Sequence, residues 1–417
     1  MENKKKFICS LPWKHLSVHP HGHVSPCCEV NWSSQTAFAK NKVNGTYTGE
    51  NLNIKNGVDQ VLNSDSFKEL RLEMLNGKVP EACTTCYDIE KVGGTSKRLR
   101  EKAPDVNYQE LTNSDGSILP DITNLELRLG NYCNLKCRSC NAESSTSWIT
   151  DYYKLKDKIN LPSNFDKVKN SPDTDYTWVE DIELYVDILK YSKNIDMLQI
   201  SGGEPFLVDK HSYLLDLLIE NNIAQNVSIS YITNANYNFD KVKGILEKLK
   251  KFKQVAISIS IDDVHERNTY IRSLSNFQLT IDNLKRFLAE YDFNFLVNQT
   301  INAFNFLYVE ELTQFLVKEG LYKLHSDHNR IYINDNYVIT PDYQSPNIIP
   351  LQYRQEKLRE IKGKVPEYFY DRLVANYHNT PDNGKLSEFI ETTKLVDKVR
   401  REKMEDIFPR LFKCTLS

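Results

Sequence analysis

The sequence predicts an α/β fold in which strands and helices alternate. Short apolar runs of strand length recur through the middle of the chain, at 125–129, 197–201, 227–233, 255–261 and 293–301, with a sixth candidate near 323–333. Segments with helical periodicity lie between them, at 213–220, 239–251, 277–290 and 309–318. This alternation implies a parallel sheet with right-handed crossovers. Six such units fit a partial or full β/α barrel better than a flat Rossmann sheet, although periodicity alone does not separate the two.

Composition shifts along the chain predict four segments. These are an N-terminal domain with five of the cysteines, a polar linker, the α/β region and a mainly helical C-terminal extension, at 1–100, 101–122, 123–335 and 336–417. The stretch 159–180 is rich in Asn, Asp, Ser and Pro and predicts an insertion loop. The helix expected at 277–290 follows Ser275, with Gln278 three residues later, which is the spacing of a capping box.

Bulk charge and hydropathy limit the partners. The 417 residues carry a net charge of -3, which gives no reason to expect nucleic acid or an anionic membrane. No apolar run approaches the roughly 20 residues that cross a bilayer. The lysine run within Met1–Phe7 is not followed by the apolar segment of a signal peptide. We therefore expect a soluble cytoplasmic protein.

The nine cysteines are informative because of their spacing. Eight of them fall into three groups, Cys9 with Cys27 and Cys28, Cys83 with Cys86, and Cys133 with Cys137 and Cys140. Close-spaced cysteines in a reducing compartment indicate metal or cluster binding rather than disulfides.

The third group has the spacing C-x3-C-x2-C and directly follows the first predicted strand of the α/β region. Three thiolates on a short loop can hold three irons of a [4Fe–4S] cluster, whereas electron-transfer clusters ordinarily use four cysteines. The fourth iron would then be open to a small molecule. A structural zinc site is the alternative, and it normally takes four Cys or His ligands.

Polar turns follow the later strands. After the second strand comes Gly202-Gly203-Glu204-Pro205, where the glycines allow close backbone approach and the carboxylate can accept a hydrogen bond from an ammonium group. A tight turn is the plain alternative. In either a barrel or an open sheet, ligands gather at these carboxyl ends of the strands.

Together these motifs resemble the radical S-adenosylmethionine (SAM) superfamily. The three-cysteine loop is similar to the family's signature loop, which implies that Cys133, Cys137 and Cys140 hold a [4Fe–4S] cluster whose open iron chelates SAM. One electron then cleaves SAM into methionine and a 5′-deoxyadenosyl radical. The sequence departs from many members at Ser139, where an aromatic residue near the adenine is common.

The resemblance also implies SAM-binding residues on later strands. Gly202, Gly203, Glu204 and Pro205 match the GGE motif that contacts the SAM amino group. Thr233 and Asn234 are similar to the family's TNG turn, with Ala235 in place of the glycine. The fourth strand matches an S-x-D segment followed by an arginine, with Ser258, Ser260, Asp262 and Arg272.

The N-terminal cysteines can form a second site. Cys9, Cys27, Cys83 and Cys86 would complete an all-cysteine site, with Cys28 as the alternative to Cys27 and nearby histidines as further candidate ligands. The G-x4-C spacing from Gly22 to Cys27 resembles the auxiliary-cluster domains called SPASM and twitch, here placed before the barrel. This resemblance implies an auxiliary [4Fe–4S] cluster, and zinc remains the alternative.

The sequence thus predicts a radical SAM core, a partial (β/α)6 TIM-like barrel, with a small N-terminal α+β cluster-binding domain and a helical extension. The expected activity is reductive cleavage of SAM and hydrogen abstraction from a peptide or a small polar molecule. An electron donor such as flavodoxin or ferredoxin is implied. The alternatives are a radical SAM enzyme that modifies RNA and a non-enzymatic, zinc-stabilised binding protein.

Overall fold

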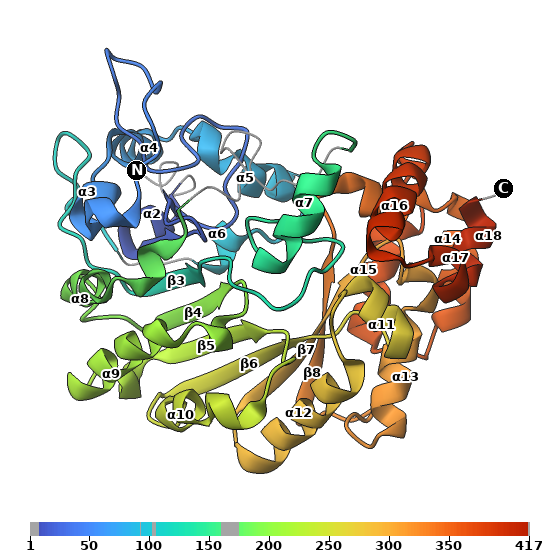
Figure 1. Cartoon of the computed structure of the whole chain (residues 1–417). Coiled ribbons are helices and arrows are strands. Elements are labelled where there is room, and N and C mark those ends of the chain that lie inside the picture. Colours follow the sequence, from blue (N-terminus) through green and yellow to red (C-terminus); the bar gives the residue numbers. More distant parts are fainter. Residues whose placement is uncertain (1–7, 92, 102–105, 160–174, 416–417) are drawn as a thin grey trace. The chain divides into compact units, whose positions relative to one another are not determined.

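The computed structural model describes residues 8–91, 93–101, 106–159 and 175–415 (Figure 1). Its chain forms two compact units, the first comprising 1–132, 165–230 and 242–255, the second comprising 133–164, 231–241 and 256–417. Parts of four predicted segments lie outside the described residues: 1–7 and 92 of the N-terminal domain, 102–105 of the linker, 160–174 of the insertion loop, and 416–417 of the C-terminal extension.

The first unit contains a mostly parallel sheet. Its strands are β1 (His15–Val18), β2 (Val24–Ser25), β3 (Asn124–Leu129) and β4 (Met197–Gly202). β1 pairs antiparallel with β2 and parallel with β3, and β3 pairs in parallel with β4. The cysteine-rich N-terminal segment and the first strand of the α/β region therefore share one sheet.

Short helices surround this sheet. They are α2 (Leu11–Lys14), α3 (Val58–Leu62), α4 (Asp65–Leu75), α5 (Thr84–Lys91), α6 (Lys97–Arg100), α8 (Ile182–Lys190) and α9 (Ser212–Glu220), with 3-10 turns η1 (Ile54–Asn56), η2 (Glu81–Cys83), η4 (Thr177–Glu180), η5 (Pro205–Leu207), η6 (Asp209–His211) and η7 (Ala224–Asn226). Arg71 of α4 is fully buried and donates to the carbonyl oxygens of Pro12, Leu62 and Gly116, so one guanidinium connects three separate segments.

The second unit contains β7 (Asn294–Ile301), which pairs in parallel with β6 (Gln254–Ser260) on one side and β8 (Ile331–Tyr337) on the other. Three elements are divided between the units: β6, β5 (Ser228–Thr233) and α10 (Phe239–Leu249). The helices are α7 (Ile149–Leu155), α11 (His265–Ile271), α12 (Phe277–Glu290), α13 (Glu310–Lys318), α14 (Leu351–Ile361), α15 (Glu367–Tyr377), α16 (Leu386–Arg400), α17 (Met404–Ile407) and α18 (Pro409–Thr415), with η3 (Thr146–Trp148), η8 (Phe306–Tyr308), η9 (Asp342–Gln344) and η10 (Pro346–Ile348).

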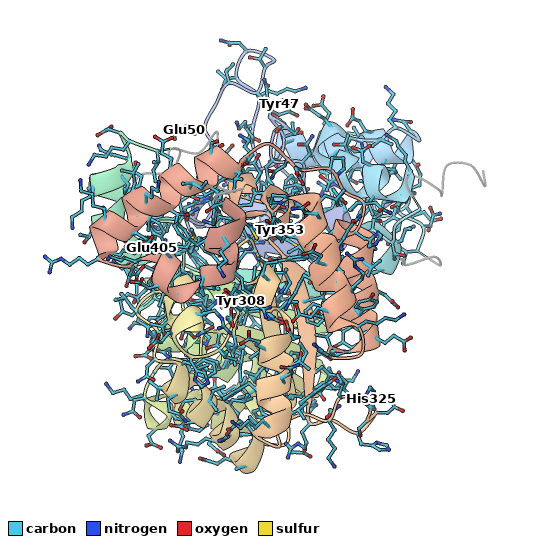
Figure 2. All side chains as sticks on the ribbon, turned by 90° about the vertical axis from the view of Figure 1, so that its right-hand side faces the viewer. Tyr47, Glu50, Tyr308, His325, Tyr353 and Glu405 are labelled. Atoms are coloured by element: carbon cyan, nitrogen blue, oxygen red, sulfur yellow. The ribbon has the colours of Figure 1, made fainter. Side chains whose placement is uncertain are left out.

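Aromatic side chains join the C-terminal helices to the rest of the second unit. The ring of Phe304, after β7, lies 4.9 Å from that of Phe389 in α16 and 5.8 Å from that of Phe408. The hydroxyl of Tyr308, which is labelled in Figure 2, accepts a hydrogen bond from the backbone N of Arg410. The extension is therefore packed onto the elements that follow β6 and β7.

The α/β class is confirmed, with two local corrections. The sixth strand begins at Ile331, so most of the run at 323–333 precedes it. The capping box at Ser275 is wrong, because the N-cap of α12 is Asn276, whose side-chain oxygen accepts from the backbone N of Leu279. Ser and Asn are both good N-caps, so the sequence alone did not decide whether Ser275 or Asn276 begins the helix. None of the described helices combines the length and apolar character needed to cross a membrane.

Candidate functional site

The three-cysteine loop follows β3 and is held in place by its own backbone. Lys136 N donates to Ser273 O at 3.0 Å, and Arg138 N donates to Ile271 O at 2.7 Å. The indole Nε1 of Trp148 donates to Cys137 O at 2.8 Å. The residues between the cysteines thus fix the loop against the end of α11 and the residues that follow it.

The thiols of this loop lie within electrostatic reach of one another. Burial raises the pKa of Cys140, and Cys137 and Cys133 add to the rise. Burial also raises the pKa of Cys137, which the guanidinium of Arg272 opposes. A bound metal centre would supply the positive charge that lets these thiols ionise.

Arg272 is positioned by Asp262. Its Nη1 donates to Asp262 Oδ2 at 3.1 Å, and the other carboxylate oxygen accepts from the backbone N of Thr300 at 2.9 Å. Burial lowers the pKa of Arg272, but Cys137 and Asp262 outweigh it, so the net shift is upward and the guanidinium stays charged. The structure therefore places Arg272 beside the cysteine loop. Asp262 binds and orients the arginine.

The turn after β5 also reaches the loop. Asn234 Nδ2 donates to Cys133 Sγ at 3.8 Å and to Asn134 Oδ1 at 2.9 Å. Thr233 Oγ1 accepts from the backbone N of Ala235, which adopts a left-handed φ of 49°. This is the conformation that glycine adopts without steric cost, and it explains why glycine is the more usual residue at such a turn.

Ser258 and Ser260 lie on one side of β6. They alternate with the buried Ile257 and Ile259 and are themselves half-buried. Both hydroxyls thus face away from the hydrophobic side of the strand.

The Gly202–Pro205 turn belongs to the first unit and packs on the end of β3. A Cβ on Gly202 would lie 2.5 Å from Leu129 N, and one on Gly203 would lie 2.3 Å from Tyr132 O. Gly203 N donates to Gly130 O, and Glu204 N donates to Tyr132 O at 2.8 Å. A side chain at either position would collide with this neighbouring backbone, so both positions require glycine whether or not a ligand is bound.

Glu204 has a local structural role as well. It is 1% exposed, and its Oε1 accepts from the backbone N of Phe206 at 3.2 Å, which caps η5 directly before Pro205. This hydrogen bond fixes the conformation of the turn at Glu204.

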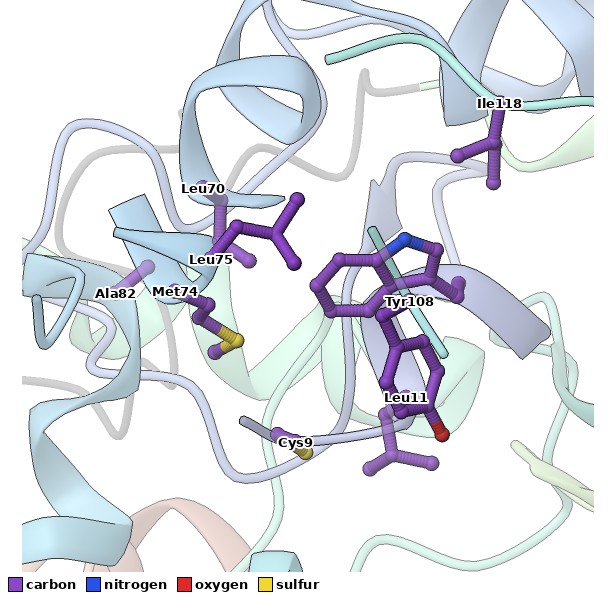
Figure 3. Close-up of a cluster of buried hydrophobic side chains, with 9 residues drawn as sticks. Cys9, Leu11, Leu70, Met74, Leu75, Ala82, Tyr108 and Ile118 are labelled. Atoms are coloured by element: carbon purple, nitrogen blue, oxygen red, sulfur yellow. The ribbon is translucent and has the colours of Figure 1, made fainter. Parts of the chain in front are cut away.

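The N-terminal cysteines converge on a hydrophobic core. Cys9 is buried among side chains from α2, α4 and the segment before β3, and Cys27 and Cys83 pack against the same cluster, formed by Leu11, Trp13, Leu70, Met74, Leu75, Ala82, Tyr108 and Ile118 (Figure 3). Cys86 follows Cys83 by one helical turn at the start of α5 and is 8% exposed.

Burial is the main influence on these thiols. It raises the pKa of Cys9 to about 11, with Cys86 adding to the rise. It also raises the pKa of Cys83, to which Cys9 and Cys86 contribute, and that of Cys27, to which Cys83 and Cys9 contribute. The buried thiols of Cys9, Cys27 and Cys83 therefore resist ionisation unless a metal centre replaces their protons.

Cys28 takes a different partner from Cys27. Its Sγ accepts from Lys97 Nζ at 3.2 Å, and Lys97 is the first residue of α6. Burial raises the pKa of Cys28, with Glu126 adding to the rise and Lys97 opposing it. This arrangement favours Cys27 as the ligand of the N-terminal group.

The histidines near Cys27 form a buried aromatic group. His21 and His23 have ring centroids 4.2 Å apart, and Phe38 packs edge-on against His19 and His21. Burial lowers the pKa of His15 to about 4 and that of His21 to about 3, so both are neutral at pH 7.

Within the described part of the chain, no three His, Cys, Asp or Glu side chains form a preassembled group for a metal ion. The donor chemistry nevertheless fits iron–sulfur clusters. The loop offers three thiols beside a buried arginine, and the ninth cysteine, Cys414, instead donates to Arg410 O in α18. The N-terminal core offers four thiols, the number that a [4Fe–4S] cluster with no open iron requires.

Family models match two parts of this chain. Residues 127–302 match the radical SAM superfamily, and residues 9–87 match SPASM, an iron–sulfur cluster-binding domain. An uncharacterized protein of Methanocaldococcus jannaschii is 25% identical over 249 residues, which cover 58% of this chain and 72% of that protein.

Two solved structures are more distant. Native anSMEcpe with bound AdoMet is 16% identical with a TM-score of 0.39, covering 64% of this chain, and this chain spans about 65% of its length. TYW1 with a lysine–pyruvate adduct bound is 10% identical with a TM-score of 0.32, covering 57% of this chain and 72% of that structure.

The two family models indicate the class of protein, one that binds SAM and iron–sulfur clusters. Residues 127–302 thus form a radical SAM domain, and residues 9–87 form an SPASM-like domain that precedes it in the chain. The predicted partial (β/α)6 barrel with an N-terminal cluster-binding domain and a helical extension is thereby confirmed as the fold class. The radical SAM domain implies a [4Fe–4S] cluster and SAM as cofactors, and the SPASM domain indicates auxiliary iron–sulfur binding.

Sequence reasoning missed several residues that surround the loop. Asp151, Trp148 and Arg400 contact it directly or through one another, but none belongs to a recognisable motif. A signal existed only for Trp148, an aromatic residue eight positions after the last loop cysteine. Arg400 is 260 residues from that cysteine, so only the folded chain brings it there.

Proposed function

We propose that this protein cleaves SAM reductively and uses the resulting radical to abstract a hydrogen atom from a peptide or a small polar molecule. When bound, SAM on the reduced cluster supplies methionine and a 5′-deoxyadenosyl radical, which takes a hydrogen atom from the substrate. The observation that carries the proposal is the set of three thiols on Cys133, Cys137 and Cys140 beside Arg272, with the fourth coordination position left to a ligand.

This chain's own residues bind and orient the cofactor. Cys133, Cys137 and Cys140 hold the cluster, while Asn234 donates toward the Cys133 sulfur and limits its movement. Arg272, held by Asp262, offers a cation for the SAM carboxylate. Glu204 offers a carboxylate oxygen for the SAM ammonium group, with the turn braced by its contact to Phe206 N.

A polar substrate is supported by one face of the sheet in the first unit. Glu126 and Arg128 lie on the face of β3 opposite to the buried Leu125 and Leu127, and Arg128 Nε donates to Glu126 Oε1 at 3.1 Å. Their register partners on β4, Gln199 and Ser201, share that face and are half-buried. Charged and polar groups on this face suit a substrate that carries hydrogen-bonding groups.

The remaining partners are part of the same proposal. The reaction needs one electron for each SAM that is cleaved, and a flavodoxin or ferredoxin in the cytoplasm would supply it. The N-terminal thiols would hold an auxiliary [4Fe–4S] cluster that accepts an electron from the substrate or positions it.

The test is formation of 5′-deoxyadenosine by anaerobically reconstituted protein with dithionite and SAM. The wild-type chain should form it, and Cys137→Ala should not, because two thiols do not retain the cluster. Equal formation by both proteins would refute the proposal.

A further inference from the structure

The C-terminal extension packs directly on the cysteine loop. α16 lies beside α7, the helix that follows the loop (Figure 1). Val396 of α16 shares a hydrophobic cluster with Trp148 and Leu155, and Cys140 packs against that same cluster. The last residue of α16 is Arg400, and its side chain is only 1% exposed.

Each partner of Arg400 also holds the loop. Arg400 Nε donates to Asp151 Oδ2 at 2.8 Å, and Asp151 pairs with Lys136 Nζ at 3.1 Å. Arg400 Nη1 donates to Ser273 Oγ at 2.8 Å, and the carbonyl of Ser273 accepts from Lys136 N. The guanidinium also lies 4.5 Å from the ring centroid of Trp148, which donates to Cys137 O.

One nitrogen of this buried cation has no acceptor among the described residues. Arg400 Nη2 is buried and makes no hydrogen bond, although Nε and Nη1 are both satisfied. Leaving a charged donor buried without an acceptor is unfavourable, so an acceptor supplied by a bound group would stabilise this arrangement. The nearby carboxylates of Asp397 and Glu402 are occupied by Arg138, so they do not serve Nη2.

We infer that Arg400 Nη2 donates a hydrogen bond to a sulfur of the cluster held by Cys133, Cys137 and Cys140. This rests on the proposed function, because it requires the cluster to form on that loop. Anionic thiolate and sulfide are the acceptors that a cluster brings, and Arg400 already lies against the loop through its contacts with Asp151, Ser273 and Trp148. Hydrogen bonds and positive charge at cluster sulfurs stabilise the reduced form.

The C-terminal extension is thus part of the cluster site. Arg400 reaches the loop from a helix far along the chain and adjusts how readily the cluster takes up an electron. An arginine suits this position because its planar fork serves Asp151, Ser273 and the sulfur at once, which a lysine does not.

The test is an EPR-monitored redox titration of the full-length, reconstituted protein. We expect Arg400→Met to shift the midpoint potential of the SAM-responsive centre to more negative values while its iron content stays near wild type. The N-terminal centre is the internal control and should not shift. Lys398→Met, which removes an exposed cation from the same helix, should leave both potentials unchanged.

Arg400→Lys separates the effect of charge from that of hydrogen bonding. It is also the variant to titrate if Arg400→Met does not bind iron. It keeps the positive charge but loses Nη2, so a smaller shift in the same direction is expected. An unchanged potential in the loaded variants would overturn the inference, as would weaker SAM binding at unchanged potential. If the wild-type chain has no SAM-responsive centre, the proposed function itself fails.

Discussion

The two cysteine sites of this chain differ in how their ligands are assembled. The loop site draws three thiols from eight consecutive residues, Cys133–Cys140, and is surrounded by cations such as Arg272. The N-terminal site draws four thiols from segments as far apart as Cys9 and Cys86 and sits in an apolar core. The first arrangement suits a centre that exchanges electrons and ligands, and the second suits a centre that holds a fold together.

This difference has a thermodynamic consequence. A local loop keeps its shape through backbone contacts such as Lys136 N to Ser273 O, so its stability does not depend on the cluster. The N-terminal core brings distant segments together around protonated thiols, and a metal centre there adds its binding energy to folding. Loss of metal from the loop site should therefore abolish SAM cleavage, whereas loss of metal from the N-terminal site should lower stability in addition to any effect on the substrate.

The largest effect is expected for Cys83→Ala. Removing one of the four thiols should release the N-terminal metal and lower the free energy of unfolding by about 4 kcal/mol or more, as loss of a structural metal does. Cys28→Ala is the matched control, because that sulfur contacts Lys97 and should be dispensable for metal. Denaturant unfolding with metal analysis checks this, and equal losses in both variants would contradict the comparison.

A second prediction concerns acid. Burial lowers the pKa of His15 from 6.5 in the unfolded chain to about 4, so the folded state binds fewer protons between these values. Stability should fall as the pH drops from 6.5 to 4, by about 3 kcal/mol for this residue alone. His15→Gln should reduce the pH dependence of the unfolding free energy, and an identical dependence in both proteins would show that His15 does not titrate in this way.

A third prediction concerns Glu204. Glu204→Gln keeps an oxygen to accept from Phe206 N but removes the charge, so the turn should persist while SAM binding weakens. Loss of a charged hydrogen bond of about 1.5–3 kcal/mol corresponds to roughly 10- to 100-fold in the Kd. Glu204→Ala should add a loss of stability of about 1 kcal/mol from the missing cap. Isothermal titration with SAM on iron-loaded protein measures the first effect, and unchanged affinity in Glu204→Gln would remove Glu204 from the binding site.

The smallest effect is expected for Ala235→Gly. Ala235 has a φ of 49°, a conformation that costs an L-residue roughly 1–2 kcal/mol and costs glycine little. The greater flexibility of unfolded glycine offsets about 0.4–1 kcal/mol of this gain. The variant should be more stable by up to about 1 kcal/mol, with SAM cleavage unchanged. A less stable variant in denaturant unfolding would show that the packing of the methyl group outweighs the backbone strain.

The sequence was informative where chemistry is local. The loop, the Gly202–Pro205 turn and the strands that they follow were all predicted, because each motif lies within a few residues and directly follows an apolar strand. The sequence explained the two glycines only by the approach of a ligand, whereas the structure shows that they also pack against Leu129 and Tyr132.

What the sequence did not provide depends on long-range contact. Lys97 contacts the Cys28 sulfur, which favours Cys27 as the ligand, and the role proposed for Arg400 depends on the packing of α16 on α7. Neither contact has a local pattern, because the partners are separated by many residues and come together only through hydrophobic packing. The capping error at Ser275 shows the same limit on a smaller scale.

The two cysteine sites are proposed to be distinct, with SAM cleaved only at the loop site. The most direct test is a variant with Ala at 133, 137 and 140, assayed for metal content and for 5′-deoxyadenosine in the same anaerobic preparation. We predict that it keeps the N-terminal metal centre and forms no 5′-deoxyadenosine. Formation of 5′-deoxyadenosine by this variant, or loss of metal from both sites together, would contradict the account.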